Sequence, residues 1–339
     1  MTVTEAYVDG WRRVRRAPAI VLGLLPLSMA VALPLALVLR GMIAQHLGTS
    51  LAAEAAVRGV NWDWWQEFSS QATGIGTTFG PAVIGFAAVL GNLSDLLDNR
   101  PLAPAVAGAV AAWLVLWSFL TGGILDRLAR NRRVGAAGFF MASGVHFFRM
   151  LRLGALALLA YALLFRLVHP ALFDALFAAL TRETTVERTA FAWRVVLYAV
   201  FGGLLVSVNV LFDYARIRLV VEDRHSAVGA LLAGARFLGR HAGACLGLYA
   251  LNTLTFLVVA GAYALVAPGA GPGGWTVWAA LAVGEAFIVA RLAVKLQFYA
   301  SQAALFQDIL AHAGHVARPA AEWPESPAAD VLRGETPRQ

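Results

Sequence analysis

The sequence predicts an all-α fold: a polytopic membrane helix bundle with six transmembrane helices. Of its 339 residues, 59% are hydrophobic and 14% are charged, whereas soluble domains usually carry about 25% charged residues. A membrane-spanning helix needs about 20 apolar residues. Charged segments, densest at 211–241, separate the stretches that meet this length. The predicted spans are residues 17–43, 103–125, 145–168, 191–213, 242–267 and 275–298.

The N-terminal residues 1–16 can form a helix with an apolar side and arginines crowded at its end. Such a helix suits the headgroup region of a membrane; the alternative is a frayed tail that only anchors the topology. In the first span, Pro26 and Pro34 each remove a backbone donor, which predicts kinks. The charged start also resembles a signal peptide, but the apolar run continues to Val38, which favours an uncleaved anchor.

Residues 44–102 form the longest segment between spans. Its three tryptophans, Trp62, Trp64 and Trp65, favour an interfacial aromatic anchor, with ligand stacking as the alternative. The apolar stretch 80–91 is too short to span and is interpreted as a re-entrant, interfacial or packed helix. The other links are 169–190 and the turn 267–274. Residues 1–309 are thus predicted as one membrane domain, followed by a flexible cytoplasmic tail, 310–339.

The distribution of basic residues predicts the orientation. Of 27 Lys and Arg, 18 lie in 1–16, 126–152, 214–241 and 299–339, and only 4 lie in the alternate segments 44–102 and 169–190. Because basic residues concentrate in cytoplasmic loops, both termini are predicted in the cytoplasm, with the chain in the cell inner (plasma) membrane. The formal net charge of +7 is explained by this topology, and no recurring aromatic–basic face points to nucleic acid.

Sequence motifs for cofactors are absent. The chain contains no P-loop, no HExxH and no GxSxG motif. Its one cysteine, Cys245, excludes a disulfide within the chain and a cysteine-based metal site. His312 and His315 are too weak a pair for zinc. We therefore expect no cofactor, no metal and no nucleic-acid partner.

The entries to the odd-numbered spans resemble one another. They are EAYVDGWRRVRRAPAIVLGLL at 5–25, GFFMASGVHFFRMLRLGALAL at 138–158 and GALLAGARFLGRHAGACLGLY at 229–249. In each, a helix rich in small and aromatic residues leads through arginine into a span. The even spans leave through charged or polar helices. This pattern predicts a threefold internal repeat with cytoplasmic amphipathic elbow helices around 3–16, 135–149 and 226–240.

The stretch DYARIRLVVEDRHSAVGALLAGARFLGRH, followed by a span, resembles bacterial multi-pass proteins of the glycerophosphodiester phosphodiesterase membrane-domain type and related inner-membrane families of unassigned activity. The resemblance covers mainly residues 195–300. In those families the membrane part is not the catalytic part, so the resemblance implies a location and a fold rather than an enzymatic activity.

Three polar residues are candidates for an intramembrane site: Glu285, Asn252 and Asn209. Glu285 lies 10 residues inside the sixth span, about 15 Å deep at 1.5 Å per residue. A carboxyl group there is costly unless it faces the bundle interior. We therefore expect Glu285 to face Asn252 and Asn209, either as a structural contact or as a proton or substrate site.

Other candidates lie at the predicted cytoplasmic face. Asp213 can pair with Arg291 or Lys295, which stand four apart on one face. The basic residues are expected to contact anionic lipid headgroups. Small residues at four-residue spacing, Gly239, Gly243 and Gly247, favour close helix packing or a homodimer contact. The interface candidates are Asp213, Arg216, Arg218, Arg236, Arg240, Arg291 and Lys295.

Together these features predict a non-enzymatic inner-membrane protein, permease-like or a membrane scaffold, that acts on lipid or a small amphiphile. Its partners would be membrane lipids and a second copy or another membrane protein. The alternatives are an intramembrane enzyme, which needs clustered His, Asp, Ser or metal ligands at one depth, and a homo-oligomeric, partner-binding membrane subunit.

Overall fold

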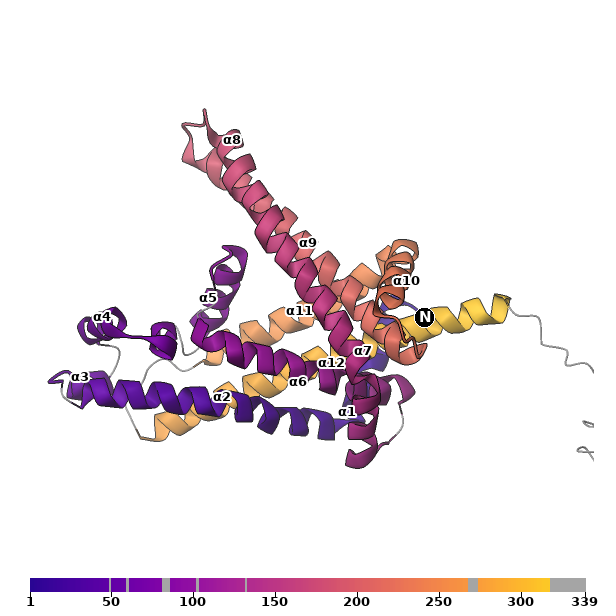
Figure 1. The fold of residues 1–339 in the computed structure, drawn as a ribbon, viewed down its shortest axis with the longest axis horizontal. Coiled ribbons are helices and arrows are strands. Elements are labelled where there is room, and N and C mark those ends of the chain that lie inside the picture. Colours follow the sequence, from indigo (N-terminus) through magenta and orange to yellow (C-terminus); the bar gives the residue numbers. More distant parts are fainter. Residues whose placement is uncertain are drawn as a thin grey trace, which may run out of the picture.

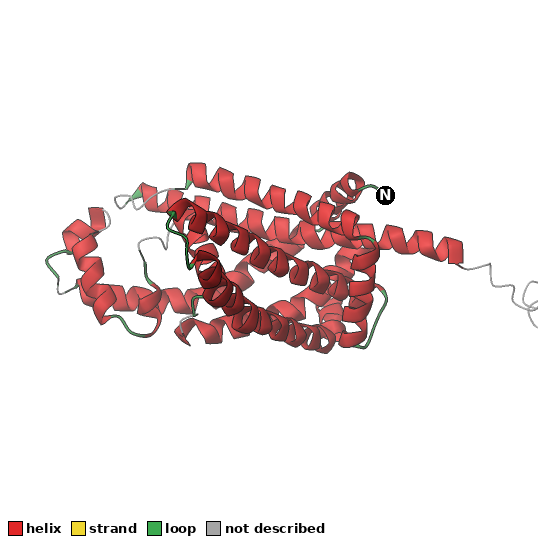
Figure 2. Cartoon of the chain, turned by 90° about the horizontal axis from the view of Figure 1, so that it is seen from above, coloured by secondary structure: helices red, strands yellow, loops and turns green. Residues whose placement is uncertain are grey.

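The chain is helical throughout the part that the computed structural model describes, which comprises residues 1–48, 50–58, 61–80, 86–101, 104–131, 133–267 and 274–317 (Figure 2). Six helices are long and apolar enough to cross a membrane, which confirms the predicted fold class. They span Pro18–Leu47, Val106–Arg130, Ala136–Thr181, Glu187–Val221, Ala242–Val266 and Trp275–Ala311.

The first half of the chain contains seven helical elements in its described residues. They are α1 (Val3–Arg15), α2 (Pro18–Leu47), α3 (Ala53–Arg58), α4 (Trp62–Gln71), the 3-10 helix η1 (Gly74–Thr78), α5 (Phe86–Leu97) and α6 (Pro104–Arg130). The second half begins with α7 (Ala136–Leu163), which continues through the π-helical turns η2 (Leu164–Val168) and η3 (Ala171–Leu176) into α8 (Phe177–Thr181). The remaining elements are α9 (Glu187–Val221), α10 (Ala227–Arg240), α11 (Ala242–Val266) and α12 (Trp275–Ala317).

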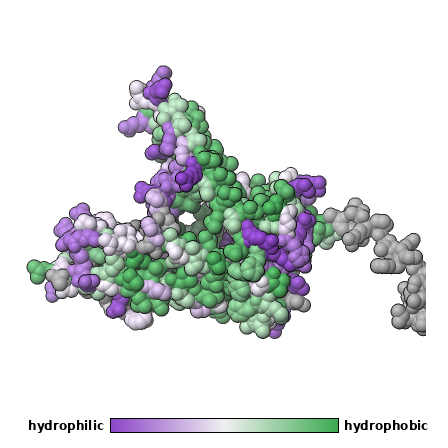
Figure 3. All heavy atoms as spheres, in the orientation of Figure 1, coloured by the Kyte–Doolittle hydropathy of each residue, from purple (hydrophilic) through white to green (hydrophobic). Residues whose placement is uncertain are grey.

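One end of the bundle, the α1 end, holds α1, α10, the link from α6 to α7 and the C-terminal part of α12 (Figure 1). Away from this end, α3, α4, the end of α11 and the start of α12 lie on the left of the picture, and α8 lies apart from them at the top. Hydrophilic residues gather in these regions in Figure 3, with hydrophobic surface between them. The described segments predicted on the cytoplasmic side therefore lie together, whereas those predicted on the opposite side are divided between the region of α3 and α4 and that of α8 (Figure 1).

Helices α7 and α9 form a two-helix arm that leaves the other helices at an angle and ends at α8 (Figure 1). Along the arm the two helices pack on each other, with Phe201 fully buried against Phe165 and His169. The outward faces of the arm are apolar and exposed; Phe191, for example, is 68% exposed. Such a surface suits contact with lipid chains rather than with water.

The core lies toward the α1 end. Helices α6, α7, α9, α10, α11 and α12 bring together fully buried residues there, among them Ile124, Leu153, Tyr214, Leu248 and Phe306. In contrast, only 11–33% of the most apolar 18-residue stretch of each spanning helix is buried within the chain. The helices are therefore held together at one end and separate toward the other.

Helix α1 is part of the bundle rather than a frayed tail. A capping box starts it, because Thr2 Oγ1 accepts from Glu5 N at 3.3 Å and Glu5 Oε2 accepts from Thr2 N at 2.7 Å. Pro18, which suits the first turn of a helix, then begins α2. The face of α1 with Ala6, Gly10 and Val14 is buried, and α1 packs against α11 and α12.

The segments that lead into the third and fifth spans differ from each other. Helix α10 begins at Ser226, whose Oγ accepts from Gly229 N at 3.1 Å, and it ends before α11. The separate helix expected around 135–149 is not present, because α7 runs without a break from Ala136 to Leu163. No proline interrupts the sequence at the corresponding junction near Arg152, whereas Pro18 marks the junction after α1.

The segment between α2 and α6 forms a small core of its own. Trp64 is 7% exposed; its ring stacks on Phe68 at 5.4 Å, and its Nε1 donates to His46 Nδ1 at 2.9 Å. Trp64 is thus packed inside the chain, whereas Trp62 is 57% exposed; the interfacial role of the three tryptophans stays a prediction. Of the stretch 80–91, residues 81–85 lie outside the described residues, and α5 begins at Phe86.

The C-terminal boundary also differs from the prediction. Helix α12 continues to Ala317 rather than ending near 298. Its turn around Ser301 packs on α1. The rest of the expected flexible tail, 318–339, lies outside the described residues.

Candidate functional site

A cavity of about 470 Å³ lies between α6, α9, α11 and α12. Figure 3 shows the surface hollowed where the arm diverges from the other helices. The walls are largely aromatic and apolar, and its polar groups come from three helices. The residues that carry the argument below are Trp113, Trp117, Asn209, Tyr249, Arg291 and Lys295.

The aromatic wall is rigid and built from neighbouring helices. On α6, the rings of Trp113 and Trp117 are stacked, with centroids 5.8 Å apart, as expected for aromatic residues four positions apart on a helix. On the facing wall, Tyr249 of α11 lies edge-to-face against Phe298 of α12 at 5.1 Å. These walls can hold an alkyl chain or an aromatic ring.

The polar side of the cavity is cationic. Arg291 and Lys295 follow each other by one helical turn on α12 and both line the cavity. Lys295 Nζ lies 4.9 Å from the centroid of the Tyr299 ring. Among the described residues, neither cation forms an ion pair. Their charges are therefore free to pair with an anion that enters the cavity.

Asp213 does not line the cavity, although its charge acts on Lys295. The carboxylate is buried and accepts from Arg216 Nη1 at 2.8 Å, one turn along α9. The pairing expected between Asp213 and Arg291 or Lys295 is thus not made, because the nearer guanidinium of Arg216 takes its place. Counting the three cations and the one carboxylate, this part of the bundle carries a formal charge of +2.

Asn209 belongs to the same cavity. Its Nδ2 donates to Tyr249 Oη at 2.9 Å, which joins α9 to α11 and fixes both side chains. The sequence predicts Asn209 as an intramembrane polar residue, and in the structure it lines the same cavity as Arg291 and Lys295. The hydroxyl of Tyr249 keeps its own hydrogen to donate, so the pair can offer a neutral donor beside the two cations.

Glu285 and Asn252 are not partners, which corrects the expectation of a shared depth. Asn252 is fully buried and its Nδ2 donates to Ser301 Oγ at 2.9 Å. Ser301 lies 16 positions beyond Glu285 on α12, which is about 24 Å along the helix. The prediction failed because it counted the depths of Glu285 and Asn252 from opposite ends of their spans, whereas Tyr263 stacks on Phe287 at 4.1 Å and sets a different register.

Glu285 itself is half-buried, and its Oε2 is enclosed without a hydrogen-bond partner among the described residues. It therefore holds no pair of spanning helices together through that oxygen. The expected structural contact with Asn252 or Asn209 is wrong, whereas a titrating role for Glu285 stays a prediction.

The arginines of α9 and α10 surround a second cavity, of about 530 Å³, at the α1 end. Arg218 pairs with Glu222 at 2.9 Å and lies 5.2 Å from the centroid of the Phe306 ring. Arg236 and Arg240 are exposed and line the same cavity. The three predicted interface arginines are thus brought together, with Arg218 held and the other two free to reach a membrane surface.

The surface predicted for close helix packing, formed by Gly239, Gly243 and Gly247, is largely uncovered in the described structure. A Cβ added to Gly239 or Gly243 would meet nothing within 4 Å in the described structure, and one on Gly247 would lie 3.8 Å from Val3 Cγ2. Close packing within the chain is therefore wrong for Gly239 and Gly243. The close contact of α10 lies on another face, at Gly234, where a Cβ would lie 3.3 Å from Ala215 N. A homodimer contact stays a prediction.

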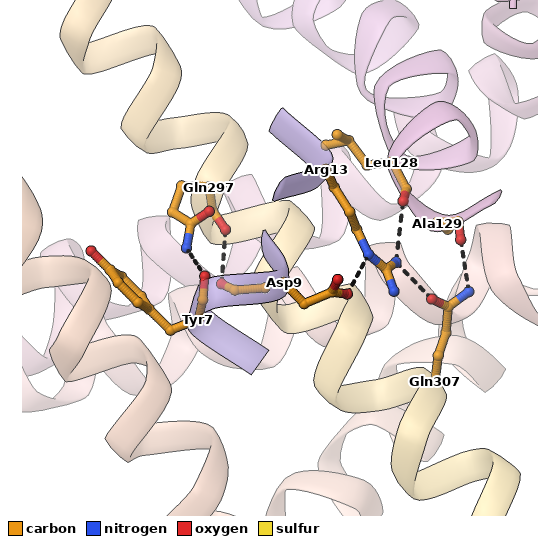
Figure 4. Close-up of polar contacts among 8 residues, drawn as sticks. Tyr7, Asp9, Arg13, Leu128, Ala129, Gln297 and Gln307 are labelled. Carbon is orange, nitrogen blue, oxygen red and sulfur yellow. Dashed lines mark hydrogen bonds and ion pairs between the residues drawn. The ribbon is translucent and has the colours of Figure 1, made fainter. Parts of the chain in front are cut away.

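A polar seam between α1, α6 and α12 was missed (Figure 4). Gln297 Nε2 donates to Tyr7 O at 2.8 Å, Arg13 Nη1 donates to Gln307 Oε1 at 2.8 Å, and Gln307 Nε2 donates to Ala129 O at 3.1 Å. Arg13 also pairs with Asp9 at 2.8 Å. The polar side chains Gln297, Ser301 and Gln302 inside an apolar helix were a signal that could have revealed this seam.

The described residues contain no group of three or more His, Cys, Asp or Glu side chains placed to hold a metal ion. Comparison with known proteins gives no match to any family model, to any curated protein or to any solved structure. The geometry of the chain therefore carries the functional argument alone.

Proposed function

We propose that this membrane protein is a non-enzymatic, permease-like component that binds an anionic amphiphile, a lipid or a smaller molecule, in the cavity between α6, α9, α11 and α12. The observation that carries the proposal is the pair Arg291 and Lys295, which lacks an ionic partner in the described structure and stands beside an aromatic wall. Such cations inside a membrane protein mark ligand or ion pathways.

The chemistry of the cavity selects the ligand class. A compact anionic group, such as a phosphate or a carboxylate, can accept from Arg291, Lys295 and Tyr249. An alkyl chain can lie along Trp113 and Trp117 and continue to the lipid-exposed faces of the bundle. A small soluble anion would leave the apolar wall uncovered, and a cationic amphiphile would meet the charge of +2.

We further propose that the protein lies in a bacterial inner membrane with the α1 end, and so both termini, in the cytoplasm. The support is the excess of arginine in the segments of that end. The resemblance to the glycerophosphodiester phosphodiesterase membrane-domain type stays part of this proposal, for location and fold only.

The threefold repeat is also a proposal, supported by a recurring contact. In the three aligned entry segments, Gly10, Ser143 and Gly234 occupy the same position. Each lies against the last turns of an even span: Gly10 against Ser301, Ser143 against Gly123, and Gly234 against Ala215. Helix α1 packs on α12, α7 on α6 and α10 on α9, which is the cyclic order that a threefold repeat predicts.

Binding of single-chain probes tests the proposed function. The full chain, held in nanodiscs of zwitterionic lipid, is titrated with dodecyl phosphate, dodecanol or dodecyltrimethylammonium. We expect dodecyl phosphate to bind at least ten-fold more tightly than the other two. The double variant Arg291→Gln/Lys295→Gln should lose this preference, whereas the matched variant Arg236→Gln/Arg240→Gln should keep it. Equal binding of all three probes would contradict the proposal.

A further inference from the structure

A third cavity, separate from the two described above, lies at the α1 end between the start of α2, the end of α6 and the start of α7. Its volume is about 740 Å³. Four arginines line one part of it: Arg15, Arg16, Arg127 and Arg133. Among the residues that the structure describes, no acidic side chain lines it. The rest of its wall is apolar, with Leu24, Leu27, Leu120, Phe139 and Phe140 among the residues.

Arg127 makes this cavity a built site rather than a surface patch of charge. The residue is 7% exposed, and its Nη2 donates to Arg16 O at 2.8 Å. That bond fixes the guanidinium between the end of α1 and the end of α6. Its Nη1 is buried and has no partner among the described residues. A buried cationic donor without an acceptor is costly, so an acceptor in the cavity would relieve the cost.

The dimensions of the cavity match half a bilayer. Along α2, the lining residues extend from Pro18 to Leu27, about 14 Å at 1.5 Å per residue. Half of a hydrocarbon core about 30 Å thick is of the same length. The arginines thus lie where a lipid headgroup would be, and the apolar wall lies where its acyl chain would run. The exposed ring of Phe140, at 51%, leaves the apolar part open toward the surrounding lipid.

We propose that this cavity binds one anionic phospholipid, with the phosphate of its headgroup accepting from Arg127 Nη1 and paired with Arg16 and Arg133, and with an acyl chain along α2. A free phosphate would satisfy the arginines but would leave the apolar wall empty. A zwitterionic lipid would fill the wall but would place a cation beside four arginines. The two halves of the site therefore select a lipid that carries a net negative charge.

The arginine half is tested with the full chain by native mass spectrometry, using dioleoyl phosphatidylglycerol against dioleoyl phosphatidylcholine. We expect one tightly retained phosphatidylglycerol and at least ten-fold weaker retention of phosphatidylcholine. Arg16→Gln/Arg133→Gln should weaken phosphatidylglycerol binding by about 25-fold, since each arginine near a membrane surface contributes about five-fold. The matched variant Arg12→Gln/Arg152→Gln removes two charges that do not line the cavity and should change binding little.

The apolar part of the cavity, where the acyl chain would lie, is tested by substituting a glycine. Gly23 lines the cavity, and a Cβ there would meet nothing within 4 Å, so Gly23→Phe should be able to place its ring in the cavity. Gly41→Phe, on the same helix and equally open, is the control. We expect Gly23→Phe to abolish the one-to-one lipid adduct and Gly41→Phe to retain it.

Three results would overturn the proposal: equal retention of the two lipids, an adduct that survives Gly23→Phe, or displacement of the lipid by an equal concentration of glycerol 3-phosphate. If Gly23→Phe does not fold, the comparison of the two arginine variants decides alone.

Discussion

Gly10 of α1 lies directly against Ser301 of α12: a Cβ on Gly10 would stand 2.7 Å from Ser301 Cβ and 2.8 Å from Ser301 N. The contact lets Gln297 reach the backbone of α1 and holds the N-terminal helix in the bundle. No side chain larger than hydrogen fits at this position without moving one of the two helices.

We therefore expect Gly10→Ala to destabilise the protein although alanine favours helices by about 1 kcal/mol. Overpacking costs about 1–3 kcal/mol, and Gly10→Leu should cost more. Gly239→Ala is the control, since a Cβ there meets nothing within 4 Å. Thermal unfolding of the purified chain should show a lower midpoint for Gly10→Ala and an unchanged or higher midpoint for Gly239→Ala. Equal midpoints for the two variants would mean that α1 is not packed as described.

Replacing Glu285 or Asn252 by alanine should change the stability of the protein to different extents. Asn252→Ala removes a buried hydrogen bond to Ser301, worth about 1 kcal/mol inside a membrane protein, and leaves a small cavity. Glu285→Ala removes a carboxyl group whose Oε2 has no partner in the described structure. We expect a lower unfolding midpoint for Asn252→Ala only. A comparable loss for Glu285→Ala would show that Glu285 does hold helices together.

The contact between α5 and the arm should be local and independent of pH near neutrality. The Tyr198 hydroxyl donates to Asp98 and lowers the pKa of that carboxyl. The contribution is present above the ordinary Asp pKa, about 3.9, and is lost only as the pH falls through the lower folded pKa. Deuterium uptake in α5, corrected for intrinsic exchange, should be equal at pH 5 and pH 8.

Removing the hydroxyl should loosen the same contact. Tyr198→Phe is expected to raise deuterium uptake in α5, whereas Tyr161→Phe, on α7 and without a hydrogen bond to α5 in the described structure, should not. Uptake in α5 that is the same in all three proteins would rule out the contact.

Reporter fusions test the proposed orientation. Fusions near residues 135, 228 and 330 should report the cytoplasm, and fusions near 60 and 180 should report the opposite side. The reason is the excess of arginine in the first set of segments. A fusion near 228 that reports the outside would contradict the proposed orientation, even if the fold is correct.

The spanning helices could be predicted from the sequence because lipid imposes a length and a polarity that few other segments meet. The sequence also identified Asn209, Arg291 and Lys295 as candidates, but at two different depths, and only the structure brings them to one cavity. The sequence could not predict which helix faces pack. Gly239 and Gly243 match the spacing for close packing, yet Gly10 and Gly234 make the close contacts, because packing depends on a partner helix that local spacing does not identify.

The sequence also could not predict the register between neighbouring helices. The partner of Asn252 depends on how α11 slides along α12, and a helix as long as α12 offers several positions. The contacts of α1 along α12, at Gln297 and Ser301, belong to a third helix that is remote in the chain. The aligned position of Gly10, Ser143 and Gly234 was a signal already present in the sequence.

The most direct test of the proposed ligand cavity is photo-crosslinking in a mixed membrane. Benzoylphenylalanine replaces Phe256, which lines the cavity, or Phe191, which lies exposed on the arm. Captured lipids are identified by mass spectrometry. We predict that position 256 captures anionic amphiphiles well above their share of the membrane, that position 191 captures lipids in proportion, and that Arg291→Gln/Lys295→Gln abolishes the enrichment. The same lipid composition at both positions would contradict the account.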